Sequence, residues 1–144
     1  MVRVVLDANL LVALAIGGER SNLVEAQLMQ WLEENAELYA PDLARYEIAS
    51  AFTGAIAGGE FTVAALPEAF GALADLPIVF CACPEGERVV EIALQLKRRS
   101  AYDAAYLALA EFLQAELWTL DGKLFRNAME YGFAVKLLDG ELDS

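Results

Sequence analysis

Short apolar segments alternate with longer amphipathic segments along the chain. Val2 to Leu6 is a run of β-branched and aliphatic residues, the pattern typical of a strand buried on both faces of a sheet. Further strands are predicted at 38–40, 77–82, 117–120 and 133–138. The intervening segments carry apolar residues at helical spacing, so strands and helices alternate.

Capping residues and glycines predict where these helices begin and end. A first, apolar helix over Leu10–Ile16 is interrupted at Gly17 and Gly18. A later helix closes at Gly58 and Gly59, because glycine is the residue most often found just past a helix end. The other predicted helix starts are Ser21 or Asn22, Asp42, Thr62, Pro84, Ser100 and Lys123.

This order of elements predicts a single α/β domain. Strands that alternate with helices form parallel sheets linked by right-handed crossovers. We expect a three-layer α/β/α domain over residues 1–140, with a central, mostly parallel sheet of about five strands. Residues 141–144 are expected to be frayed. A length of 144 residues, 58% of them hydrophobic, suffices for one domain with its own core.

Composition excludes several classes of chemistry. Histidine is absent, which removes serine and cysteine nucleophiles activated by imidazole, and two-histidine zinc sites. Cys81 and Cys83 are too close together to close a long loop, and we interpret them as small hydrophobic residues. The longest apolar run, Leu10–Ile16, is shorter than the roughly 20 residues of a membrane span, so a cytoplasmic protein is expected. Because histidine is absent, any acid–base or metal-dependent chemistry must rest on carboxylates.

Two aspartates each follow a predicted strand directly. Asp7 ends the first strand and Asp121 ends the fourth. Ligands of open parallel sheets bind beyond the carboxyl ends of the strands, where such side chains emerge from the sheet. An aspartate in this position also commonly caps the next helix, and that simpler interpretation stays open.

Two further acids are placed on predicted helices. Asp103 lies in the first turn of an apolar helix, where a carboxylate is also explained by the helix dipole. Glu47 lies in the middle of the helix that starts at Asp42, and taken alone it fits a solvated helix face. The aromatic residues Trp31, Trp118, Tyr106 and Phe112 are interpreted as core or interface residues.

The ordered set of motifs resembles the PIN-domain ribonucleases, a family that includes the VapC-type toxins of toxin–antitoxin pairs. The resemblance is carried by VLDAN at 5–9, Glu47 on the third helix, YDAAYLALA at 102–110 and WTLD at 118–121. It covers nearly the whole chain. It implies that Asp7, Glu47, Asp103 and Asp121 form an acidic metal site. It also implies that Asn9 and Thr119 support the first and last of these acids.

Such a site has a clear physical logic. Four crowded carboxylates repel one another, and a divalent cation keeps them ionised. Oxygen ligands favour Mg²⁺ or Mn²⁺, which would hold a phosphate and activate water. We assign Asp7, Asp103 and Asp121 as metal ligands, Asp121 directly or through water, and Glu47 as the residue that positions the water. The resemblance further implies endonucleolytic cutting that leaves a 5′-phosphate.

The charge balance raises a question about an RNA substrate. Ten basic residues stand against 22 acidic ones, for a net charge of −12 that repels a polyanion at long range. Arg98 and Arg99 precede Asp103 and Arg126 follows Asp121, so they are candidate substrate-binding residues. A basic run at a helix end also complements the helix dipole, which is the simpler alternative.

We therefore expect a Mg²⁺- or Mn²⁺-dependent endoribonuclease, a toxin restrained by a possible cognate antitoxin and acting as a homodimer. The apolar helices between Leu10 and Trp31 are candidate partner surfaces, although core packing explains them nearly as well. Two alternatives are a phosphotransferase that forms an aspartyl-phosphate, and a binding module without turnover. The first of these usually requires a second acid where this chain has Asn9.

Overall fold

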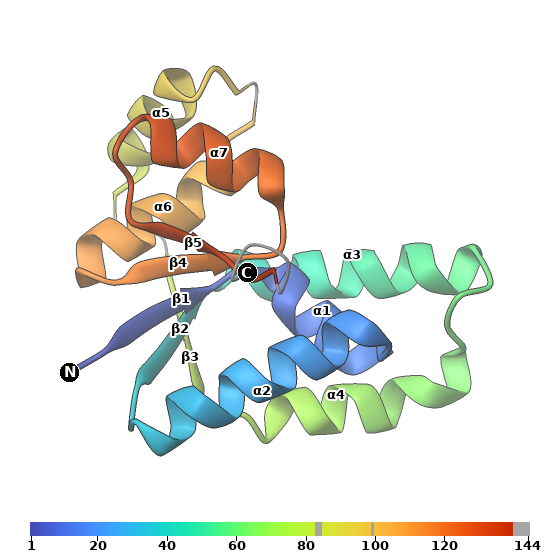
Figure 1. Cartoon of the computed structure of the whole chain (residues 1–144). Helices are drawn as coiled ribbons and strands as arrows, with labels where there is room; N and C mark the ends of the chain where they lie inside the picture. The colour runs from blue at the N-terminus through green and yellow to red at the C-terminus, as the bar shows by residue number, and fades with distance from the viewer. Residues whose placement is uncertain (83–84, 99, 140–144) are drawn as a thin grey trace.

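A computed structural model describes residues 1–82, 85–98 and 100–139 as a layered α/β structure (Figure 1). In chain order its elements are β1 (Arg3–Leu6), α1 (Ala8–Ile16), α2 (Glu19–Glu33), β2 (Glu37–Pro41), α3 (Leu43–Ala57), the 3₁₀ turn η1 (Val63–Ala65), α4 (Leu66–Ala74), β3 (Ile78–Cys81), α5 (Gly86–Gln95), α6 (Tyr102–Leu113), β4 (Glu116–Thr119), α7 (Gly122–Glu130) and β5 (Val135–Leu137).

The five strands form one sheet in the order β3-β2-β1-β4-β5, and every neighbouring pair is parallel. The chain builds β2 and β3 on one side of β1, then crosses to build β4 and β5 on the other side. The strand order therefore reverses between β1 and β4, and a crevice opens beyond their carboxyl ends at such a point. The predicted parallel α/β sheet is confirmed.

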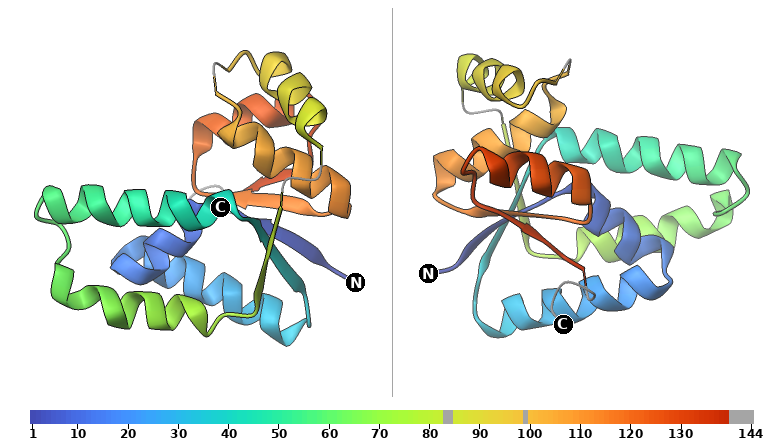
Figure 2. Two further views of the ribbon diagram at one scale, coloured as in Figure 1. Left: turned by 180° about the vertical axis from the view of Figure 1, so that it is seen from behind. Right: turned by 45° about the horizontal axis from the view of Figure 1, so that its top comes forward.

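Helices cover both faces of the sheet. In the views of Figures 1 and 2, α5, α6 and α7 lie over one face, and α1 and α2 lie against the other. Helices α3 and α4 extend to the side as an antiparallel pair. This distribution follows from right-handed crossovers, because reversing the direction of sheet growth moves the connecting helix to the opposite face.

The core lies where these layers meet. Val4, Val5 and Leu6 of β1 are buried, as expected for a central strand covered on both faces. The indole rings of Trp31 and Trp118 meet edge to face with centroids 5.2 Å apart, joining α2 to β4. Trp31 is therefore buried and Trp118 is partly buried against the core, whereas the side chain of Phe112 is exposed.

Some helices begin at residues other than those predicted from the sequence. Helix α2 begins at Glu19, not at Ser21 or Asn22, because Gly17 and Gly18 adopt φ values of 94° and 100° and turn the chain at once. The Ser21 hydroxyl instead donates a hydrogen bond to the Leu14 carbonyl at 3.0 Å. The hydroxyl is thus used to join α2 to α1.

Helix α6 begins at Tyr102, one residue later than predicted, and Thr62 precedes the turn η1, not an α-helix. The side chain of Asp42 makes no capping bond to α3, because its backbone is already helical. The predictions for Cys83, Pro84, Arg99 and 141–144 concern residues outside the described ranges. Among the described residues, no helix is long and apolar enough to cross a membrane.

Candidate acidic site

Asp7 lies at the carboxyl edge of the sheet, where β1 ends. Its backbone N–H donates to the Trp118 carbonyl at 3.0 Å, which continues the pairing of β1 with β4 by one residue. The side chain is the N-cap of α1 and accepts a hydrogen bond from the Asn9 backbone N–H at 3.4 Å. Asp7 therefore caps α1 and also lies at the carboxyl edge of the sheet. The two interpretations of Asp7 offered by the sequence are compatible.

Asp121 is placed in the same way at the end of β4. Its Oδ1 accepts hydrogen bonds from the backbone N–H groups of Lys123 and Leu124, at 2.9 and 3.2 Å. These bonds satisfy two donors at the start of α7 and fix the carboxylate against the helix N-terminus. Unlike Asp7, the Asp121 side chain is exposed.

The Thr119 hydroxyl connects these two aspartates. This buried oxygen donates to Asp7 Oδ2 at 2.8 Å and accepts the Asp121 backbone N–H at 3.0 Å. It also accepts from Asn9 Nδ2 at 3.1 Å, while Asn9 Oδ1 accepts the Leu120 backbone N–H at 3.2 Å. One hydroxyl donor and two acceptor positions are thereby all used. Asn9 and Thr119 thus form one hydrogen-bond network with Asp7.

Glu47 is held by a contact that the sequence did not reveal. The Tyr106 hydroxyl donates to Glu47 Oε1 at 2.5 Å and accepts the Ala8 backbone N–H at 3.3 Å. Burial, together with the hydrogen bond to Glu47, raises the pKa of Tyr106 far above its usual range. Tyr106 therefore remains a hydrogen-bond donor at any physiological pH and joins α6 to α3 and α1.

Tyr106 was predicted to be a core aromatic, and its ring is indeed buried. Sequence reasoning missed its polar end. The available signal was its spacing from Asp103, because residues three apart on a helix share a face. The Tyr106 hydroxyl lies on the helix face that carries Asp103, and this was the one local sequence feature that pointed to a contact with Glu47.

The four acids influence one another electrostatically. Burial raises the pKa of Asp7 from 3.8 to about 6, and the charges of Glu47 and Asp103 add to this increase. Burial is also the main cause of the raised pKa of Asp103, to which Asp121 adds and which Arg98 opposes. Side chains from β1, α3, α6 and β4 are thus brought into one region.

The donor chemistry of this region fits a hard cation. Its available ligands are carboxylate oxygens, the type that Mg²⁺ and Mn²⁺ prefer. The arrangement is not a closed cage, because no three acidic or cysteine side chains in the described ranges are close enough together to hold a metal ion.

A cleft of about 380 Å³ opens beside two of the acids. Asp7 and Glu47 line it together with Asn9 and Arg20 of α2, and the remaining lining is apolar. Arg20 was not among the predicted site residues. It reaches the cleft because the Gly17–Gly18 turn folds α2 back along α1, and no local signal in the sequence indicates that placement.

The predicted basic residues have different surroundings. Arg98 Nη1 lies 3.9 Å from Asp103 Oδ2, and its Nε is buried without a hydrogen-bond partner among the described residues. The exposed Arg126 lies over Gly122, where an added Cβ would be 2.9 Å from its Nη1. Arg126 therefore folds back toward the start of α7, beside Asp121. Arg99 is outside the described ranges.

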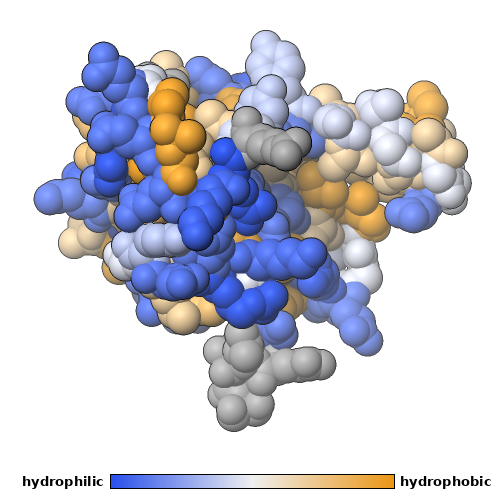
Figure 3. All heavy atoms as spheres, turned by 90° about the horizontal axis from the view of Figure 1, so that it is seen from above, coloured by the Kyte–Doolittle hydropathy of each residue, from blue (hydrophilic) through white to orange (hydrophobic). Residues whose placement is uncertain are grey.

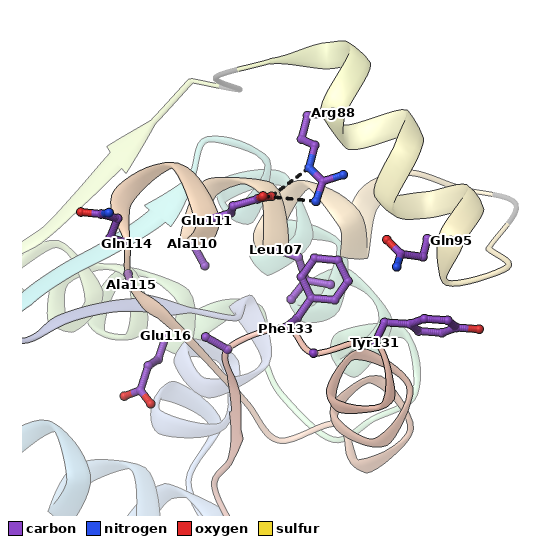
Figure 4. A pocket seen from close by; sticks show the side chains of 12 residues that line it. Arg88, Gln95, Leu107, Ala110, Glu111, Gln114, Ala115, Glu116, Tyr131 and Phe133 are labelled. Atoms are coloured by element: carbon purple, nitrogen blue, oxygen red, sulfur yellow. Dashed lines mark hydrogen bonds and ion pairs between the residues drawn. The ribbon is translucent and has the colours of Figure 1, made fainter.

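A larger hollow, of about 450 Å³, lies at the opposite edge of the sheet between α5, α6 and residues 131–134 (Figure 4). Arg88 and Glu111 form a two-pronged ion pair on its wall, at 2.9 and 3.2 Å. The paired charges cancel, so this hollow offers little to a metal or phosphate. The face above α5, α6 and α7 is mostly hydrophilic (Figure 3).

Comparison with known proteins identifies a family match over most of the chain. A family model described as PIN domain matches residues 5–136. No curated protein matches the sequence. The solved structures that resemble the fold include the following two. PAE2754 from Pyrobaculum aerophilum is 24% identical, with a TM-score of 0.67 over 88% of this chain and 79% of that one.

The second structure is a domain of a functionally unknown protein from Methanocaldococcus jannaschii DSM 2661. It is 16% identical, with a TM-score of 0.52 over 97% of this chain and 93% of that one. At these identities the two structures support the fold alone, and the family assignment rests on the match over residues 5–136.

Neutralising Asp7 is expected to stabilise the metal-free protein at neutral pH. The pKa of the Asp7 carboxyl is about 6 in the folded protein, above its ordinary value of 3.8. The folded state therefore favours the protonated acid. Wild-type stability should therefore fall as the pH rises from about 4 to about 6. Urea unfolding in chelator should show Asp7→Asn more stable above that window by up to about 3 kcal/mol. A difference that is independent of pH would contradict this.

Proposed function

The chain belongs to the PIN-domain family, and from that premise we propose that it is a Mg²⁺- or Mn²⁺-dependent endoribonuclease with its active site at the acidic edge of the sheet. PIN domains are generally nucleases. The observation that carries the proposal is that Asp7, Glu47, Asp103 and Asp121, from four separate segments, share the carboxyl edge at the strand-order reversal.

In this proposal Asp7, Asp103 and Asp121 would hold the metal. When bound, a divalent ion supplies charge neutralisation at the scissile phosphate and lowers the pKa of an attacking water. Asp7 accepts a hydrogen bond from the Thr119 hydroxyl, and Asp121 accepts one from the start of α7. Asp103 lies in the first turn of α6, 3.9 Å from Arg98.

Glu47 is proposed to orient the attacking water. Its Oε1 accepts the Tyr106 hydroxyl proton at 2.5 Å, which leaves Oε2 to accept a hydrogen bond from water. Because the chain has no histidine, a carboxylate is the available side chain for accepting the water's proton. Arg98 and Arg20, close to Asp103 and to the cleft, would contact the RNA phosphates.

The geometry favours this function over the alternatives. Aspartyl-phosphate chemistry would require an acid near position 9, but the Asn9 amide is engaged with Thr119 and Leu120. A binding module without turnover would have no need for acids gathered so closely that their charges help to raise the pKa values of Asp7 and Asp103.

We expect Asp103→Asn and Asp7→Asn each to abolish metal-dependent cleavage of RNA, because each removes a ligand charge. Asp75→Asn, which alters an exposed acid at the end of α4, is the matched control and should retain full activity. Cleavage of a labelled RNA, with and without Mg²⁺ or Mn²⁺, provides the measurement. Added metal should also raise the melting temperature of the native chain more than that of either site variant.

Tyr106→Phe is expected to lower kcat by tenfold or more, an order-of-magnitude effect of misplacing Glu47, with little change in KM. The lost hydroxyl also leaves the Ala8 N–H without its acceptor, at a cost of about 1 kcal/mol in the free energy of unfolding. Steady-state kinetics and urea unfolding measure the two effects. A purely structural role would lower stability without changing kcat at temperatures where the variant is folded.

A toxin role is part of the proposal. It is supported by the family, and by exposed apolar side chains at Met29 and Leu32 of α2 and Phe70 of α4, available to a second copy or an antitoxin. Expressing the chain in a bacterial host should arrest growth, and Asp103→Asn should not. Co-expression of a small protein encoded next to it should restore growth. RNA cleavage without any growth effect would indicate a stand-alone processing nuclease.

A further inference from the structure

Arg98 is a cation at the border of the acidic site. Its Nη1 lies 3.9 Å from Asp103 Oδ2, and the two side chains are 34% and 36% exposed. At that distance the pair is joined by charge and not by a hydrogen bond, so Arg98 leaves both Asp103 oxygens available to another ligand. Arg98 therefore supplies positive charge to the site without using the oxygens that would bind a metal.

The backbone around Arg98 is held from two sides. The Arg98 N–H donates to the Ala93 carbonyl at 2.9 Å and closes the end of α5. Lys97, just before it, has a φ of 60°, the left-handed conformation common at helix ends. The Leu96 carbonyl accepts a hydrogen bond from Asn127 Nδ2 of α7 at 3.1 Å. The turn that carries Arg98 is therefore tied to both α5 and α7.

The guanidinium of Arg98 is also partly withdrawn from water. Its Nε is buried and has no hydrogen-bond partner among the described residues. Charges attract more strongly where water is excluded, so a partly buried cation acts on a neighbouring carboxylate more than a fully solvated one does. Burial and the charge of Asp121 disfavour the ionised form of Asp103, whereas the charge of Arg98 favours it. Arg98 thus stabilises ionised Asp103 in the metal-free protein.

We propose that Arg98 is the built-in counter-ion of the acidic site, which keeps Asp103 ionised in the metal-free protein and competes with a divalent ion for it. The inference rests on the proposed metal-dependent function and adds a residue that sets how much metal the protein needs. Two cations attracted by the same carboxylate repel each other, so the charge of Arg98 lowers the affinity of the site for metal. Arg98 acts here as a positioning residue, before any substrate is present.

Calorimetric titration with Mg²⁺ or Mn²⁺ alone tests the competition. Arg98→Gln removes the charge and should bind either ion about twofold to fivefold more tightly than the native chain, the factor expected for a partly exposed ion pair. Arg98→Lys keeps the charge and should bind as the native chain does. Arg88→Gln is the matched control, because Arg88 forms a comparably exposed ion pair with Glu111 away from the site, and it should leave metal affinity unchanged. Unchanged or weaker binding by Arg98→Gln overturns the inference, since a residue that only orients Asp103 would support metal binding.

Stability in chelator separates this inference from the proposed metal site. Urea unfolding at mildly alkaline pH is measured for the native chain, Arg98→Gln, Asp103→Asn and the double variant. Arg98→Gln should raise the unfolding equilibrium constant about twofold to fivefold more in the native chain than in the Asp103→Asn background, because only the native chain loses a charge attraction. Equal effects in the two backgrounds overturn the counter-ion. Coupling in chelator, together with a native chain that binds neither ion, supports the counter-ion and refutes only the proposed metal site.

Discussion

The site depends on one buried hydroxyl group at the junction of two parallel strands. Thr119 Oγ1 donates to Asp7 and accepts from both the Asn9 amide and the Asp121 backbone N–H. Because β1 and β4 are adjacent in the sheet, this single atom fixes the first acid relative to the last. Asp7 and Asp121 are also the N-caps of α1 and α7.

Gathering carboxylates at this edge of the sheet lowers the stability of the folded protein. The fold limits this loss of stability. Burial and neighbouring acids raise the pKa of Asp7, so its ionised form is disfavoured in the metal-free protein. The starts of α1, α6 and α7 lie beside Asp7, Asp103 and Asp121, and helix N-termini favour negative charge. Such strain is typical of sites kept for function at the expense of stability.

Net charge constrains how the proposed RNA substrate could bind. Long-range attraction is absent at a net charge of −12. The proposed RNA recognition would then rely on short-range contacts, from arginines near the acids such as Arg98 and from a metal ion held by the carboxylates. Each of these contacts acts only within a few ångströms.

By itself the sequence determined the alternation of strands and helices, the parallel sheet and the places of Asp7 and Asp121 at strand ends. These features follow from local periodicity and from one rule of sheet topology. Only the tertiary structure decided that Tyr106 holds Glu47, that Arg20 lines the cleft, and that Glu47 faces the site instead of solvent. The sequence signals for these contacts were faint or lacking, because each joins segments far apart in the chain and depends on how helices pack across the sheet.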